Sequence, residues 1–230
     1  MAGETVKTEA TCLAIHPWSQ TSHTVVWLAP EGRLTTLVKG AVRPKSAFLG
    51  QYDLNYTCEI VYYARARAGV YVLRECFPLE RRDGLRHDLA ALAIASYFRA
   101  LCDALAPQGP ECAEWHALLN AALDALPGAA SPVGELVAFE IAVLKLMGLW
   151  PGVSPGGGSF ELRGERRFEV TAPVARCLAA PRDEKNFDVL LDAARAIGVF
   201  YTFHVDAAAE ARRYALQIVA KHTQERLRTK

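Results

Sequence analysis

The sequence predicts an α+β protein in which a small N-terminal β-barrel precedes a C-terminal helical bundle. From Lys7 to about Leu79, short runs of β-favouring residues alternate with turn signals and show no helical period. From Gly84 onward the composition shifts to alanine and leucine, and the spacing of apolar residues lengthens from two to about 3.6 residues. We therefore predict a first domain over residues 1–82 and a helical domain over residues 83–230.

Five strands are expected in the first domain, separated by turns such as Pro30-Glu31-Gly32 and Arg65-Ala66-Arg67-Ala68-Gly69. Their expected positions are Glu9–His16, His23–Leu28, Leu34–Val42, Tyr52–Ala64 and Val70–Phe77. Five short strands in about 75 residues suit a closed Greek-key barrel of the OB type, which hides its sheet edges by curling.

Helical periodicity then predicts six helices, with Ser131-Pro132 supplying an N-cap and a first-turn proline for the third. The expected spans are Asp88–Leu105, Cys112–Leu126, Ser131–Met147, Pro173–Ala180, Asn186–Ile197 and Asp206 to about Arg226. The third helix is apolar nearly all round, so it should form the buried centre of the bundle. Glu140 within it requires a partner, for which an arginine from the bundle is the favoured candidate over a catalytic role.

Residues 149–182 are interpreted as an insertion in the helical domain. A proline- and glycine-rich loop, Trp150–Ser159, leads into a hairpin over Ser159–Thr171 with Arg163-Gly164-Glu165 at its turn. The last residues, which include Arg226, Arg228 and Lys230, are expected to form a frayed tail.

Charge is distributed unevenly along a chain whose formal net charge is only +1. Residues 33–74 carry seven cations against two anions, a local net charge of +5. This excess predicts contact with an anionic partner such as a phosphate backbone, although a solvated basic face is the simpler alternative. The cations are Arg33, Lys39, Arg43, Lys45, Arg65, Arg67 and Arg74.

Tyrosines are interleaved with these cations, and aromatic rings can stack on bases. We assign Tyr56 and Tyr62 to the barrel core, and leave Tyr52, Tyr63 and Tyr71 open between core and surface.

Other classes of protein are disfavoured. The N-terminus lacks a secretory signal. The most apolar run, Leu136–Trp150, is shorter than the roughly 20 apolar residues of a membrane span. We therefore expect a cytoplasmic protein without membrane contact. The six cysteines contain no CxxC pair, and Cys112 with His116 supplies only two metal ligands. The Gly156-Gly157-Gly158 run lacks the lysine of a phosphate-binding loop. No nucleophile and base are marked, so we expect neither an enzyme nor a bound cofactor or metal.

Several stretches resemble the RecO family of bacterial recombination mediators. The most specific is Lys39 to Ser46, which is similar to that family's Lys-Gly-Ala-Arg-Arg-Pro-Lys-Ser signature with Val42 in place of one arginine. The others are Thr11-Cys12-Leu13-Ala14-Ile15, Glu31-Gly32-Arg33-Leu34, Phe139-Glu140 to Leu144, and Gly148.

The resemblance implies an OB-fold joined to a helical domain, without catalysis. It implies binding to single- and double-stranded DNA, annealing of complementary strands, and help for RecA in displacing the single-stranded-DNA-binding protein, with RecR as partner. The family often has a four-cysteine zinc site in the insertion, but residues 149–182 contain only Cys177, so no zinc is expected.

The resemblance also implies a dock for the acidic tail of the single-stranded-DNA-binding protein, which ends in an apolar residue. Its candidate residues in the helical domain are Arg212, Arg213, Tyr214 and Leu216, for which a solvated helix face is an equal alternative. Two alternatives to the DNA-annealing mediator remain open, an OB-fold RNA-binding protein and a non-catalytic protein-interaction scaffold.

Overall fold

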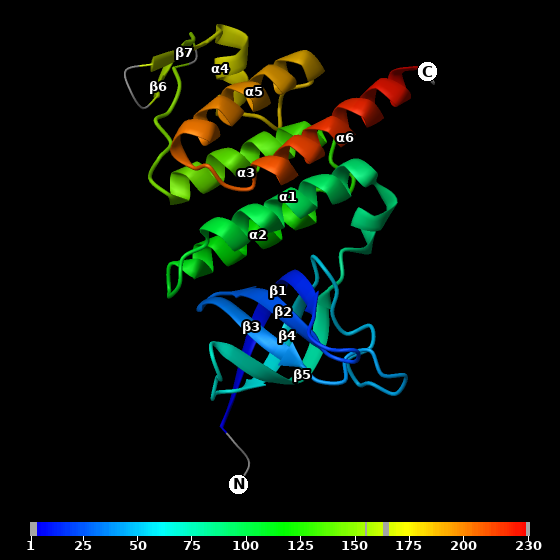
Figure 1. The fold of residues 1–230 in the computed structure, drawn as a ribbon. Helices are drawn as coiled ribbons and strands as arrows, with labels where there is room; N and C mark the ends of the chain where they lie inside the picture. Colours follow the sequence, from blue (N-terminus) through cyan, green and yellow to red (C-terminus); the bar gives the residue numbers. More distant parts are fainter. Residues whose placement is uncertain (1–3, 155, 163–165, 229–230) are drawn as a thin grey trace. The chain divides into compact units, whose positions relative to one another are not determined.

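The computed structural model describes residues 4–154, 156–162 and 166–228 of the chain (Figure 1). The chain divides into two compact units, called unit 1 (Met1–Asp83 and Arg99–Leu123) and unit 2 (Gly84–Phe98 and Asp124–Lys230). The strands are β1 (Thr5–Pro17), β2 (His23–Ala29), β3 (Gly32–Val38), β4 (Thr57–Tyr63), β5 (Val70–Glu80), β6 (Gly158–Leu162) and β7 (Arg166–Val170). The helices are the short 3-10 helix η1 (Asp83–His87) and α1 (Leu89–Leu105), α2 (Cys112–Ala125), α3 (Pro132–Leu146), α4 (Ala172–Ala179), α5 (Phe187–His204) and α6 (Ala209–Arg228).

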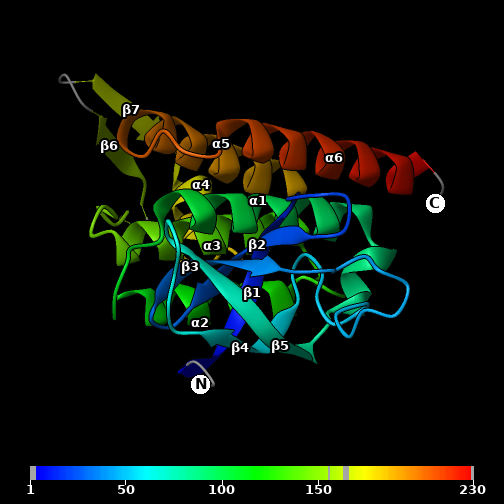
Figure 2. The same cartoon turned by 60° about the horizontal axis from the view of Figure 1, so that its bottom comes forward.

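The first five strands form a closed barrel in the order β1-β2-β3-β5-β4 (Figure 2). The pairs are antiparallel except for β3 and β5, which run parallel and complete the closure. The first half of β1, Thr5–Thr11, pairs with β4, and its second half, Thr11–Pro17, pairs with β2. The predicted α+β fold, an OB-type barrel followed by helices, is confirmed.

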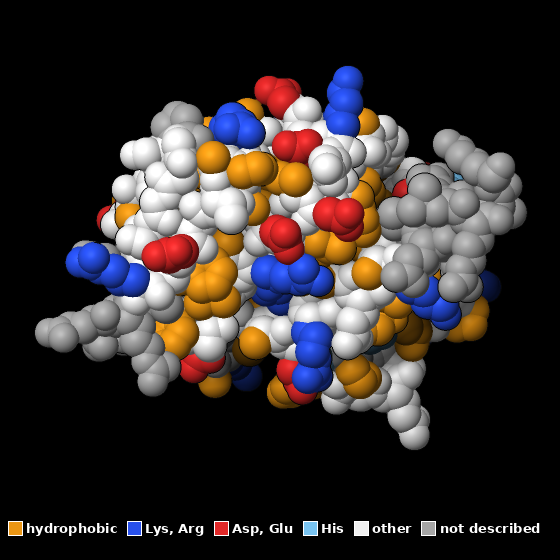
Figure 3. Space-filling model, turned by 90° about the horizontal axis from the view of Figure 1, so that it is seen from above, with side chains coloured by type: hydrophobic (Ala, Val, Ile, Leu, Met, Phe, Trp, Pro, Cys, Tyr) orange, Lys and Arg blue, Asp and Glu red, His pale blue; other side chains and the backbone are white. Residues whose placement is uncertain are grey.

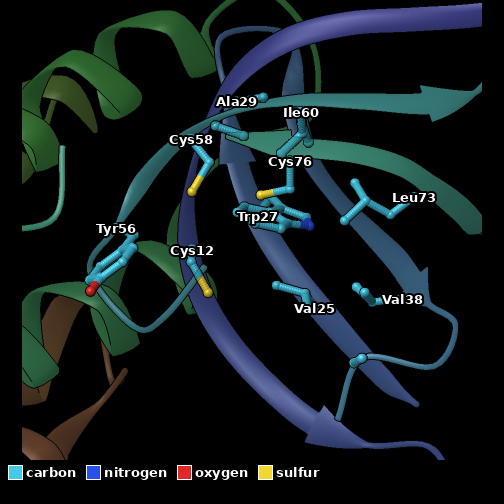
Figure 4. Close-up of a cluster of buried hydrophobic side chains, with 12 residues drawn as sticks. Cys12, Val25, Trp27, Ala29, Val38, Tyr56, Cys58, Ile60, Leu73 and Cys76 are labelled. Carbon is cyan, nitrogen blue, oxygen red and sulfur yellow. The ribbon is translucent and has the colours of Figure 1, made fainter. Parts of the chain in front are cut away.

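The barrel core is built around Trp27, whose indole nitrogen donates a 2.8 Å hydrogen bond to the hydroxyl of Thr36. The side chains of Cys12, Cys58 and Cys76 surround the indole (Figure 4). Buried cysteine behaves as a small hydrophobe, which explains why three cysteines lie in this core without a disulfide.

Within unit 1, α2 packs on the barrel through a polar cluster. The side-chain oxygen of Asn120 accepts hydrogen bonds of 2.7 and 2.8 Å from the hydroxyls of Thr11 and Thr57. Arg82 donates to the same oxygen at 3.1 Å and to the Thr57 hydroxyl at 2.8 Å. Since buried polar groups need partners, this cluster fixes one face of α2 to β1 and β4.

Two strands are shorter than the sequence predicted, because the backbone turns left-handed where they were expected to run. β3 ends at Val38, before Gly40 with a φ of 66°. β4 begins only at Thr57, after Asn55 with a φ of 69°. Both positions favour glycine or asparagine, and neither angle fits a strand.

In unit 2, α3 is the buried centre that its composition predicted, with Leu136, Val137 and Leu144 fully buried. Ser131 caps it as predicted, accepting a 3.0 Å hydrogen bond from the backbone of Gly134. The expected arginine partner of Glu140 is Arg212 of α6, whose Nε lies 2.6 Å from Oε1 and whose Nη2 lies 3.1 Å from Oε2. The hydroxyl of Tyr97 donates a third hydrogen bond, of 2.6 Å, to Oε1.

The insertion contains the predicted hairpin as β6 and β7, paired in register from Gly158 with Val170 to Leu162 with Arg166. Its expected turn, Arg163-Gly164-Glu165, lies outside the described residues. α5 continues to His204, seven residues past its expected end at Ile197, and Gly198 lies inside the helix beneath the guanidinium of Arg212. A Cβ at Gly198 would lie 2.5 Å from Arg212 Nη1.

Candidate nucleic-acid interface

β3 alternates between a buried and an outward face. Thr36 and Val38 point into the barrel, whereas Arg33 and Lys39 are exposed at opposite ends of the outward face. Because successive side chains of a strand point to opposite sides, Arg33 in β3 and Lys39 directly after it both lie on the outward side. Leu37 lies between them and pairs with Thr24 on β2 and Val72 on β5.

Leu37, together with Val70 and Val72 of β5, forms the floor of a pocket of about 490 Å³, which we call the basic groove. Three predicted cations lie along it, Lys39 after β3 and Arg65 and Arg67 before β5. Among the described residues none of these three cations makes an ion pair within 4.0 Å, so their charges are available to an outside anion. The lining residues are Trp18, Thr24, Leu37, Lys39, Arg65, Arg67, Ala68, Val70 and Val72.

The turn between β4 and β5 places the two arginines. Arg67 and Val70 exchange two backbone hydrogen bonds of 3.0 Å, and the two residues between them, Ala68 and Gly69, have φ values of 50° and 76°. Two left-handed residues in a two-residue loop make a type I′ turn, whose twist matches that of the strands. The predicted turn is thereby confirmed, and it holds Arg67 directly beside the groove.

Arg43 and Lys45 lie on an exposed loop after β3 and do not line the groove. That loop is bonded to the loop between β1 and β2, because Val42 N–H donates to Thr21 O at 3.2 Å and Gly40 N–H donates to the Ser22 hydroxyl at 3.2 Å. The two loops therefore form one surface beside the groove.

The remaining two predicted cations have acidic partners. Arg33 Nη1 lies 3.1 Å from Asp103 Oδ1 on the part of α1 that belongs to unit 1, and also donates to the Asp103 carbonyl. Arg74 Nε lies 3.2 Å from its neighbour Glu75. Both pairs are exposed, so they are weak and solvent-screened.

Sequence reasoning missed Trp18. This residue follows β1, its side chain is 64% exposed, and it lines the groove. The available signal was a tryptophan in a short Pro17-Trp18-Ser19 connection between two strands, where packing does not require an indole.

Most of the tyrosines considered for base stacking pack in or against the barrel core. Tyr56 is buried as predicted, and Tyr62 packs against the core with its ring centroid 4.8 Å from that of Tyr71. Tyr52 packs against the core and its hydroxyl lies 2.8 Å from His23 Nδ1. Tyr63 is exposed.

The residues expected to bind an acidic tail are divided between two environments in unit 2. A groove of about 620 Å³ between α5 and α6 is lined by Arg212, Arg213 and Leu216, but not by Tyr214, which is exposed elsewhere on α6. Arg212 is occupied by Glu140, and burial, which by itself lowers the pKa of its guanidinium, is outweighed by that carboxylate, which raises it. Arg213 is exposed and lies 3.8 Å from Glu210.

Figure 3 views the α4, α5 and α6 side of unit 2, where basic and acidic side chains are interspersed with exposed hydrophobic ones. Among the residues that Figure 3 colours by type, no charge of one sign dominates, in contrast to the basic groove of unit 1.

The described residues show no cluster of three or more His, Cys, Asp or Glu side chains that could hold a metal. Cys177, the single cysteine of residues 149–182, is buried in α4, so this segment does not fit a four-cysteine zinc site. None of the described helices is both long and apolar enough to cross a membrane.

Comparison with known proteins gives a family match over most of the chain. Residues 86–230 match the model of the recombination protein O C-terminal region. The chain is 30% identical over 145 residues to the DNA repair protein RecO of Moorella thermoacetica, covering 63% of this chain and 53% of that protein. It is 27% identical over 151 residues to RecO of a Roseiflexus species, covering 66% and 53%. The matches therefore span about half the length of these relatives.

Proposed function

The chain belongs to the RecO family, and on that premise we propose that it is a DNA repair and recombination mediator that binds DNA through the basic groove of unit 1. It binds single- and double-stranded DNA without reading sequence, anneals complementary strands, and with RecR assists RecA on DNA covered by the single-stranded-DNA-binding protein. No catalytic step is part of this function. The observation that carries the proposal is the convergence of Lys39, Arg65 and Arg67 on one groove without acidic partners among the described residues.

The chemistry of annealing requires such a surface. Cations that contact phosphates give affinity without sequence preference, because the phosphate backbone is the same at every position. Two complementary strands repel each other, and a basic surface that holds both reduces this repulsion. Arg43 and Lys45, on the loop next to the groove, extend this surface, while Arg33 and Arg74 can exchange their weak acidic partners for phosphates.

The test is a titration of a labelled single-stranded oligonucleotide over a salt series, with strand annealing measured on the same samples. The triple variant Lys39→Gln/Arg65→Gln/Arg67→Gln should bind more weakly, and the slope of log K against log salt should become shallower by about 2, since each phosphate contact contributes about 0.7. It should also anneal more slowly.

A matched control removes the same charge from exposed cations of unit 2, as Lys145→Gln/Arg176→Gln/Lys185→Gln. It should bind and anneal like the wild type. Equal losses in the two triple variants would refute the groove, because net charge alone would then explain them, and a wild type that binds no DNA at low salt would refute the proposed function.

For the partner tail, we propose the groove between α5 and α6, with Leu216 contacting the apolar end and Arg213 the acidic residues. A labelled acidic peptide ending in phenylalanine should lose affinity for Leu216→Glu and Arg213→Glu and keep it for Lys185→Glu. Unchanged binding in the first two variants would place the tail elsewhere.

A further inference from the structure

Trp18 has the largest exposed fraction, 64%, among the exposed large hydrophobic side chains of the described residues. Exposing this much apolar surface to water is unfavourable, and tryptophan is enriched at interfaces. The indole lines the basic groove, so its exposed area faces the same space as the three cations.

The backbone that carries this indole is held in place. Trp18 N–H and Ser19 N–H both donate to the carbonyl of Ser22, at 2.9 and 3.2 Å, which closes the loop between β1 and β2. The same loop accepts the hydrogen bonds from Val42 and Gly40 described above. The ring is therefore presented from a fixed turn, and less conformational freedom is lost when a ligand contacts it.

The groove offers three kinds of contact to a nucleotide. Lys39, Arg65 and Arg67 are suited to phosphates, and Trp18 offers a flat aromatic face. Leu37, Val70 and Val72 form an apolar floor for a sugar or the edge of a base. A volume of about 490 Å³ lies within the range of about 300 to 1,000 Å³ typical of small-ligand sites.

A base in a duplex already has both faces covered by its neighbours, whereas an unpaired base can leave the stack and lie on an aromatic side chain. We propose that Trp18 stacks on an unpaired nucleobase while the cations of the groove hold the adjacent phosphates, so that this groove binds single-stranded DNA in preference to duplex. This inference rests on the proposed function and adds the residue that distinguishes the two forms of DNA.

The experiment measures affinity for a labelled oligothymidylate and for a duplex of the same length, at one salt concentration. Trp18→Ala should weaken single-strand binding about 5- to 150-fold, the range expected for loss of one stacked base. Its duplex affinity should stay within twofold of the wild type. Trp18→Phe, which keeps an aromatic face, should retain most of the single-strand affinity.

Phe77→Ala is the matched control, because Phe77 is also an exposed aromatic residue of the barrel, at 51%, but does not line the groove. It should change neither affinity. Both exposed residues contribute little to the core, so the circular dichroism and unfolding midpoint of each variant should match the wild type.

Tryptophan fluorescence gives a second readout. Trp27 and Trp115 are buried and Trp150 packs against Phe160 in unit 2, so quenching by oligothymidylate should come mainly from Trp18 and should disappear in Trp18→Phe.

The outcomes separate the two proposals. If the wild type binds both forms of DNA and Trp18→Ala weakens both equally or neither, the stacking inference is refuted and the proposed function stands. Absence of any binding by the wild type would refute both.

Discussion

The buried ion pair between Glu140 and Arg212 gives the sharpest prediction about stability. Glu140 is fully buried, Arg212 is 13% exposed, and the pair is joined by two charge-assisted hydrogen bonds. The variant Arg212→Met keeps much of the aliphatic volume and, among the described residues, leaves the carboxylate with the hydroxyl of Tyr97 as its remaining side-chain donor. An unpaired buried charge is strongly destabilising.

The expected loss follows from two estimates. Two hydrogen bonds to charged groups contribute about 1.5 to 3 kcal/mol each. Removing one partner of a buried pair costs about 3 to 5 kcal/mol. We therefore expect Arg212→Met to lower the free energy of unfolding by about 3 to 5 kcal/mol, a large part of the roughly 5 to 15 kcal/mol that stabilises a typical domain.

Urea unfolding followed by circular dichroism measures this loss. With a slope of about 2 kcal/mol per M, the midpoint should fall by roughly 1.5 to 2.5 M. Arg213→Met is the matched control, since the neighbouring Arg213 is 71% exposed and its pair with Glu210 is weak, and its midpoint should hardly change.

A double variant tests the cause. Glu140→Gln/Arg212→Met removes both charges and keeps an amide oxygen for Tyr97, so it should be at least about 2 kcal/mol more stable than Arg212→Met alone. If Arg212→Met costs less than about 1 kcal/mol, or if the double variant is no more stable than the single one, the pair does not hold a buried charge and the reasoning fails.

Three further predictions concern unit 1 and the cysteines. Asn120→Leu removes the acceptor shared by Thr11 and Thr57 and should lower the free energy of unfolding in urea by about 2 to 4 kcal/mol. Asn120→Asp keeps an oxygen at this position and should lose less. Equal losses in the two variants would contradict the role of the acceptor. Burial lowers the pKa of His116 below its usual 6.5, although the charges of Glu9 and Glu31 oppose this shift. The unfolded state therefore binds more protons, and the free energy of unfolding should fall as pH drops below about 6.5. His116→Gln should lack this fall, and identical pH profiles of the variant and the wild type would contradict the role of His116. All six cysteines are buried, and burial, together with the charge of Glu184, raises the pKa of Cys177 to about 11. A thiol reagent at neutral pH should therefore react only as fast as the protein unfolds locally or globally. Rapid reaction of a folded sample would contradict this burial.

The sequence predicted the fold where local chemistry decides it. The Arg65 to Gly69 turn, the Ser131 cap and the apolar composition of α3 each specify a local conformation, and each was confirmed. The position of Glu140 in an apolar helix also predicted an arginine partner, because a buried carboxylate requires a group that pairs with its charge.

The structure differs from the sequence-based predictions where a residue distant in the sequence determines the local conformation or contact. Gly198 was interpreted as a helix end, but it lies inside α5, where the guanidinium of Arg212 occupies the space that a Cβ would fill. Arg33 reads as an isolated cation, but Asp103, 70 residues later, lies beside it. The groove itself was not predictable, since it depends on a parallel pairing of β3 with β5 that brings Leu37 beside Val72.

The cations of the candidate site were predicted as a group, without their division into groove, loop and paired residues. Their individual DNA contacts stay a prediction. Trp18 was missed because its position between two strands indicates a surface connection but does not show that the indole lines a groove.

The spacing of the Glu140 pair along the chain also sets an order of events during synthesis. Arg212 follows Glu140 by 72 residues, which at roughly 5 to 20 residues per second corresponds to about 4 to 14 s of translation. Throughout that interval α3 carries a carboxylate whose arginine has not yet been made, so packing it fully into the bundle is penalised. Complete burial of Glu140 is therefore expected only after α6 has been synthesised and can supply Arg212.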